Sequence, residues 1–189
     1  YYMGVDLRFD HSLRIPRPDL SMSFETPNAC TQCHSDKSDQ WAEEYITKWY
    51  GIRRRPHYGS VFAKAQKGDP QAMQDLVRIA EDGLFPAIVR STALLLLSPY
   101  QGEIRDLALR RALHDEAALI RHTALRNYAA PDPEVAIKLL TPLLYDPVKG
   151  VRMEAAANLV SLSDRLQTES LKRAYTAALA EYEAAMSYS

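Results

Sequence analysis

The sequence is poor in glycine and cysteine, with seven and two of them in a chain of 189 residues. Few glycines beside abundant alanine and leucine favour helices over a β-sandwich. Two cysteines exclude a disulfide-rich scaffold. The longest apolar run, 93–97, has five residues, far fewer than the roughly 18 that a membrane-spanning helix needs. We therefore expect an all-α protein without a membrane span.

The chain also lacks an excess of charge of either sign. Its 23 lysines and arginines face 24 acidic residues, and the formal net charge is −1. This balance gives no positive field to hold a nucleic acid or an anionic membrane surface. Residues 1–6 have neither the basic nor the apolar region of a signal peptide, and residues 180–186 keep a helical pattern without a stop signal. We expect a piece of a longer protein, with no nucleic-acid partner.

Three parts follow one another along the chain. Residues 1–57 show no helical or strand period up to about residue 36, and then a helix that Asp36 or Ser38 caps and Gly51 ends. Residues 58–163 hold helical repeats. Residues 164–189 form a last amphipathic helix, which packs on the final repeat or leads into a further repeat array. The irregular start is ordered only if a cofactor or a neighbouring domain organises it.

Beyond residue 70 the sequence repeats with a period of 31 residues. The equivalent positions are Val89, Ile120 and Val151, each followed by arginine, and Ala93, Ala124 and Ala155. Each unit holds two short helices that are too small to bury an apolar face alone, so we expect residues 70–186 to stack as antiparallel helix pairs with these apolar positions buried. The pattern resembles short HEAT-like repeats, which implies a short α-solenoid.

The same period carries a charged pair. Asp115 and Asp146 lie 31 residues apart, as do the arginines of the repeats, whereas Leu84 stands where the first unit would have aspartate. Repetition at a fixed period is what packing demands. We therefore expect a structural Arg–Asp ladder between turns, incomplete at the first unit, rather than a ligand site.

The motif that carries chemistry is Cys30-Thr-Gln-Cys33-His34, the pattern of c-type haem attachment. Two intervening residues let both sulfurs reach the two vinyl groups of one porphyrin. The imidazole directly after the second cysteine is then held under the iron as the proximal ligand. The sequence thus predicts one covalent haem c, bound through Cys30 and Cys33 and ligated by His34.

Three other uses of the motif stay open at this stage. A thioredoxin-like redox pair would lie beside a βαβ unit, and the sequence shows no strand pattern. A zinc site would combine Cys30, Cys33 and His34 with His11 or His57, although adjacent Cys and His ligands strain tetrahedral closure. A plain disulfide or two free thiols is the third possibility.

Residues 6–21, 26–34, 36–38 and 41–42 together resemble a family of bacterial multihaem c-type cytochromes. In that family a haem-rich N-terminal part runs into HEAT-like and then tetratricopeptide repeats. The resemblance covers essentially the whole chain, strongly over residues 5–51 and at the level of pattern over 70–186. It implies that this chain is the last haem segment plus the helical array. The sequence departs from the family in carrying one haem motif rather than several.

Further residues are candidates for contacts with the haem. We predict His11 as the sixth iron ligand, because 19 residues give enough chain to return over a porphyrin from Cys30, with His57, Met3 and Met22 as alternatives. Arg14, Arg17 and Arg53–Arg55 suit the propionates, because a guanidinium binds a carboxylate with two bonds, or else form a solvated basic loop. Trp41, Tyr45 and Trp49 either cover the haem or pack in a core.

These features predict an electron-transfer module: one covalent haem on a helical-repeat scaffold, situated in the periplasm or otherwise outside the cytoplasm. The expected partners are other haem domains or redox proteins, with a possible protein partner on the solenoid surface. The alternatives are an interaction scaffold with a structural or absent haem, and an enzyme with an open iron position. No acid–base constellation near the motif supports catalysis.

Overall fold

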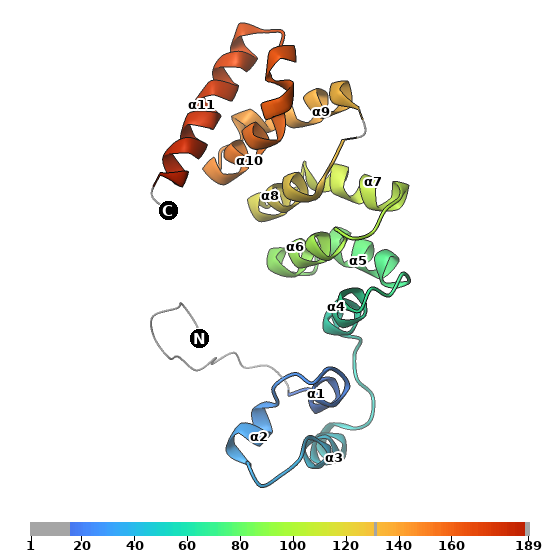
Figure 1. The fold of residues 1–189 in the computed structure, drawn as a ribbon. Helices are drawn as coiled ribbons and strands as arrows, with labels where there is room; N and C mark the ends of the chain where they lie inside the picture. Colours follow the sequence, from blue (N-terminus) through green and yellow to red (C-terminus); the bar gives the residue numbers. More distant parts are fainter. Residues whose placement is uncertain (1–15, 131, 188–189) are drawn as a thin grey trace. The chain divides into compact units, whose positions relative to one another are not determined.

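The computed structural model describes residues 16–130 and 132–187, and over these residues it contains helices and no strand (Figure 1). The all-α prediction is therefore confirmed. The chain divides into two compact units, residues 1–60 and 61–189. No helix in the described ranges is long and apolar enough to cross a membrane.

The first unit contains α1 (Pro18–Phe24), α2 (Ala29–Cys33) and α3 (Asp39–Tyr50). The helices α1 and α2 lie in the stretch that we expected to be irregular. They have seven and five residues, too few to display a helical period, and local groups define their ends. Pro18 occupies the first turn of α1, and Asn28 caps α2.

The third helix behaves as the sequence predicts. The Ser38 side chain accepts a hydrogen bond from the Trp41 backbone and caps α3, and Gly51 ends the helix with a φ of 82°. Glycine adopts this left-handed conformation without the steric penalty of a Cβ. The face that α3 buries carries Ala42 and Ile46, and α1 and α2 both pack against α3.

The second unit is a succession of short helices. In chain order they are α4 (Tyr58–Gln66, which begins at the end of the first unit), α5 (Ala72–Glu81), α6 (Ala87–Leu96), α7 (Glu103–Ala112), α8 (Ala118–Asn127), α9 (Pro133–Leu140), η1 (Thr141–Tyr145), α10 (Lys149–Leu159), η2 (Val160–Arg165) and α11 (Glu169–Met186).

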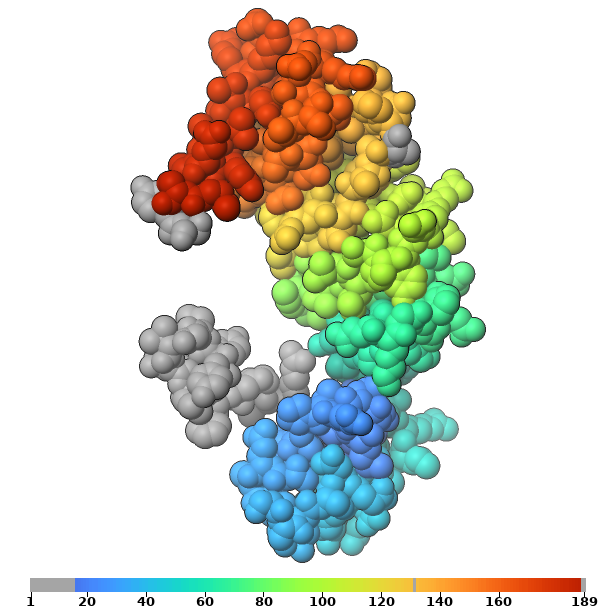
Figure 2. Space-filling view, in the orientation of Figure 1, coloured from blue at the N-terminus to red at the C-terminus, as the bar shows by residue number. Residues whose placement is uncertain are grey.

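Their packing follows the sequence repeat. The helix α5 packs on α6, α7 on α8, and α9 on α10, and each second helix also contacts the next second helix, α6 with α8 and α8 with α10. The last helix, α11, packs on α10. These helices form one continuous body in the space-filling view (Figure 2).

The apolar positions of the repeat are buried at equivalent places, as predicted. Ile120 and Val151 are 0% and 1% exposed, and Val89 is 7% exposed. The three equivalent alanines, Ala93, Ala124 and Ala155, have no exposed surface. Small side chains at these positions let neighbouring second helices approach closely.

The predicted charge ladder is also present. Arg90 pairs with Asp115, and Arg121 pairs with Asp146 at 2.6 Å, so each arginine reaches the aspartate of the next unit. Arg152 finds no aspartate one period on, and it pairs instead with Glu181 of α11 at 2.6 Å. Leu84, at the aspartate position of the first unit, is 94% exposed. The ladder thus starts at Arg90 and ends on the last helix.

The close packing of the second helices makes a stability prediction. Replacing Ala124 with leucine should destabilise the protein by about 1–3 kcal/mol, because the extra methylenes have no space between α6, α8 and α10. Urea unfolding followed by circular dichroism measures the change. The same substitution at the exposed Ala180 on α11 is the matched control. Equal unfolding midpoints for the two variants would contradict the packing argument.

Candidate functional site

The two cysteines lie on one helical turn. The helix α2 ends at Cys33, and Cys30 stands three residues earlier, so both side chains belong to one face of the helix. Both cysteines are free; Cys30 is half-buried and Cys33 is exposed. Two thiols on one face with access to solvent can both react with the edge of a single planar group.

A buried asparagine fixes the position of this helix. The Asn28 side chain accepts a hydrogen bond from the Cys30 backbone N–H at 3.0 Å and donates from Nδ2 to Asp39 Oδ1 at 2.8 Å. Asn28 is 6% exposed. One side chain therefore caps α2 and ties it to the first turn of α3. The sequence shows Asn28 only as part of a turn, and its second bond depends on packing that the sequence does not display.

His34 ends α2 and turns toward α3. Its backbone N–H donates to the Cys30 carbonyl at 2.9 Å, and its exposed ring lies 5.0 Å from the ring of Trp41, centroid to centroid. The imidazole therefore stands directly beside the two thiols, with an aromatic neighbour that limits its orientation. These are the three donor groups that a c-type haem uses.

The rival uses of the motif gain nothing from this geometry. Within the described ranges no three histidine, cysteine or acidic side chains converge in a way that could hold a metal ion. A zinc site of Cys30, Cys33, His34 and His57 would need such convergence. The strand pairs of a thioredoxin-like fold are likewise missing from the part of the chain that the structure describes. Cys30 and Cys33 are not joined as a disulfide.

The residues present fit a covalent haem. The thiols are free and share one helical turn, and the imidazole that follows them is exposed. Cys30 and Cys33 would hold the porphyrin edge, and His34 would ligate the iron. Arg14, His11 and Met3, which we predicted as further haem contacts, lie outside the described residues.

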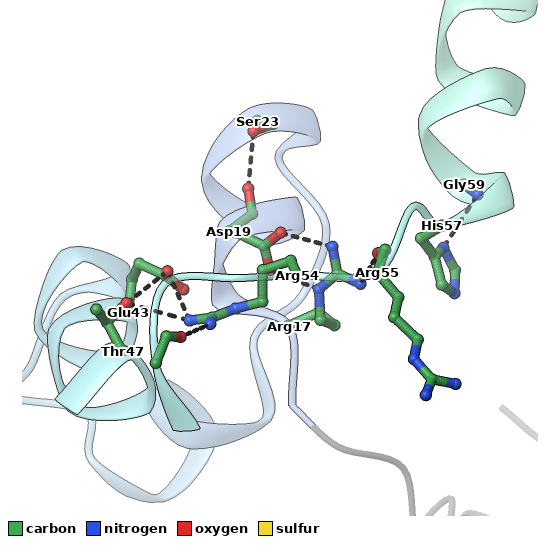
Figure 3. Close-up of polar contacts among 10 residues, drawn as sticks. Arg17, Asp19, Ser23, Glu43, Thr47, Arg54, Arg55, His57 and Gly59 are labelled. Carbon is green, nitrogen blue, oxygen red and sulfur yellow. Dashed lines mark hydrogen bonds and ion pairs between the residues drawn. The ribbon is translucent and has the colours of Figure 1, made fainter. Parts of the chain in front are cut away.

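Arg17 has partners of its own within the first unit (Figure 3). Its guanidinium donates two hydrogen bonds to the Asp19 carboxylate, at 2.8 and 2.7 Å, and a third to the Arg55 carbonyl at 3.0 Å. The hydrogen bond from Arg17 lowers the pKa of Asp19, and the same bond raises the pKa of Arg17. Its contact with a propionate stays a prediction, and Asp19 would compete for the same guanidinium.

Arg54 is the member of the basic segment with a structural role (Figure 3). It donates to Glu43 Oε1 at 2.9 Å, to the Thr47 hydroxyl at 3.1 Å and to the Gly51 carbonyl. This guanidinium ties the segment after α3 back onto that helix. The sequence analysis missed it; the spacing of Glu43 and Thr47, one helical turn apart, is the signal that could have shown a shared partner.

The alternative iron ligands within the described residues occupy different surroundings. His57 Nδ1 accepts a hydrogen bond from the Gly59 backbone at 3.0 Å, at the start of α4, and its ring lies 4.2 Å from that of Tyr58 (Figure 3). Met22 is 46% exposed on α1. Their roles as sixth ligands stay predictions.

The aromatic residues of α3 do not belong to its buried face. Tyr45 is 40% exposed and Trp49 is 63% exposed, and Trp41 is half-buried. The core side chains of this helix are Ala42 and Ile46. Core packing therefore does not account for the three large rings, and they remain available to the surroundings of His34.

Comparison of the chain with protein-family models, with curated proteins and with solved structures finds no match. Its function is therefore argued from its own residues.

Proposed function

We propose that this chain is an electron-transfer module that carries one covalent c-type haem. The observation that supports it most strongly is the single turn of α2, which presents two free thiols and then an exposed imidazole. Haem, when bound, supplies an iron that changes its oxidation state by one electron. The two cysteines would keep that group attached through both oxidation states. His34 would set one axial position, and its contact with Trp41 would limit rotation of the imidazole.

The second unit serves in this proposal as a HEAT-like scaffold, a short α-solenoid of helix pairs. The 31-residue period, the equivalent burial of its alanines and the Arg–Asp ladder support this assignment. Such a scaffold offers a surface for other haem domains or redox proteins.

The resemblance to bacterial multihaem c-type cytochromes fits this function. Members of that family mature outside the cytoplasm, so we place the protein in the periplasm or an equivalent compartment. Electron transfer is favoured over catalysis because no acid–base constellation accompanies the motif.

The proposal is tested on protein matured in a bacterial periplasm. An alkaline pyridine haemochrome spectrum should show a c-type haem, and the intact mass should exceed that of the polypeptide by one haem. An unmodified mass with stoichiometric zinc would overturn the proposal. Carbon monoxide added to the reduced protein separates the two haem functions: a six-coordinate electron carrier resists binding, whereas an enzyme with an open iron position accepts it.

The sixth ligand gives a separate prediction. Replacing His11 with alanine should convert a low-spin spectrum to high-spin and open the iron to carbon monoxide, because a bis-histidine iron loses one axial ligand. Absorption spectroscopy of the oxidised and reduced protein measures both effects. His57→Ala is the matched control and should stay low-spin. A low-spin spectrum that survives in His11→Ala would remove His11 from the iron.

A further inference from the structure

Four aromatic rings lie in contact one after another from the proximal histidine along α3. The ring centroids are 5.0 Å apart from His34 to Trp41, 5.1 Å from Trp41 to Tyr45 and 5.5 Å from Tyr45 to Trp49. The last three residues follow at intervals of four, so they share one face of the helix. At a rise of about 1.5 Å per residue, the row covers about 12 Å of the helix axis between Trp41 and Trp49.

The row runs from the motif to solvent. Trp41 is half-buried, Tyr45 is 40% exposed and Trp49 is 63% exposed. All three rings are tilted or edge-on to their neighbours, which is the favourable arrangement of aromatic pairs. The Lys48 ammonium lies 5.9 Å from the centre of the Tyr45 ring and covers part of it. The helix buries its opposite, small-residue face, so the order of these rings serves something other than the core.

We propose that this aromatic row couples His34 electronically to the surface, and that Trp49 is the place where electrons enter or leave the module. The inference rests on the proposed haem function. Electron tunnelling weakens steeply across gaps between non-bonded atoms, and rings in contact keep each such gap short. The electron crosses in a single step between the haem and an outside redox centre. No tryptophan or tyrosine is oxidised on the way, and no proton moves.

The test uses the haem-loaded protein with a photoactive ruthenium(II) polypyridyl complex on a thiol introduced by Tyr50→Cys. Tyr50 is 68% exposed and directly follows Trp49. After a light flash the excited ruthenium(II) gives one electron to the ferric haem, which yields ruthenium(III) and ferrous haem. Transient absorption of the haem measures the rate.

Three variants in the labelled background separate the row from general effects. Tyr45→Leu removes one ring and should slow electron transfer several-fold. Tyr45→Phe keeps the ring without the hydroxyl and should restore the rate. Glu44→Leu, exposed on the same helix and outside the row, should leave the rate unchanged. Circular dichroism and the haemochrome spectrum establish that each variant is folded and loaded. If Tyr45→Leu does not fold, Trp49→Leu takes its place.

The outcomes distinguish this inference from the proposed function. Equal rates in Tyr45→Leu and Glu44→Leu, with haem bound in both, overturn the aromatic path and leave the haem module standing. A slow Tyr45→Phe variant overturns single-step tunnelling, because it shows that the hydroxyl takes part. A parent protein without covalent haem overturns both proposals.

Discussion

Replacing both Cys30 and Cys33 with serine should abolish covalent haem binding while leaving the helical fold in place. Serine hydroxyls do not form thioethers with the porphyrin vinyl groups, and neither cysteine side chain belongs to the buried core. Protein matured in a periplasm should therefore lose all haem on extraction with acidified acetone. Intact mass and the haemochrome spectrum measure the loss, and far-UV circular dichroism follows the fold.

A matched substitution lies inside the same motif. Gln32→Ser changes an exposed side chain between the two cysteines and should keep the haem attached. Retention of haem by the double-serine variant after extraction would show that the thiols do not hold it. Loss of haem in Gln32→Ser alone would show that the motif tolerates no change of any kind and that the thiols were not being tested.

Replacing Arg121 with methionine should produce the largest loss of stability in the second unit, about 3–5 kcal/mol, because it leaves the Asp146 carboxylate buried without its charged partner. The side chains of Arg121 and Asp146 are 11% and 4% exposed. Arg121 also donates to the Asp115 and Glu116 carbonyls, both at 2.8 Å. Urea unfolding measures the loss. Arg126→Met, exposed on the same helix, should change stability by less than about 0.5 kcal/mol.

The pH dependence of this difference identifies its cause. Burial acts to raise the pKa of Asp146, but the hydrogen bonds from Arg121 and from the Val148 backbone outweigh burial and leave the pKa lowered. A lowered carboxyl pKa stabilises the fold above the unfolded value of about 3.9, and the contribution is lost as the pH falls through the folded pKa. The gap between wild type and Arg121→Met should therefore narrow in acid. A gap independent of pH would point to lost packing instead of a lost ion pair.

The repeats were predictable because they are written several times in the sequence. One period fixes the helix pairs, and it also fixes which apolar positions face the neighbouring pair. Arg121 and Asp146 could be assigned to a ladder because each recurs at 31 residues. The end of the ladder could not, because Glu181 lies off the period and reaches Arg152 only through the packing of α11 on α10.

The first unit was less predictable because single local contacts, rather than a period, shape it. The helices α1 and α2 are too short for apolar spacing to show, and Asn28 acts through one cap and one side-chain bond to Asp39. Arg54 gave no sign in the sequence of being folded back onto α3. The Cys30–His34 motif was clear from sequence because its chemistry depends on adjacent residues alone.

The row of rings on α3 illustrates the limit of periodicity. Trp41, Tyr45 and Trp49 repeat every four residues, and so do Ala42 and Ile46 one position later. Either set could form the buried face by spacing alone. The close approach of α1 to α3 selects the smaller side chains for the core, and the large rings are left on the side of His34.

The most direct test of the haem assignment is a peptide map of the protein matured in a periplasm. Trypsin should cut after Arg14 and Lys37 and spare the Arg17–Pro18 bond, so that Cys30, Cys33 and His34 fall in one peptide, 15–37. The account predicts that this peptide carries the mass of one haem through two thioether bonds. Recovery of peptide 15–37 without haem, with two thiols or one disulfide, would contradict it.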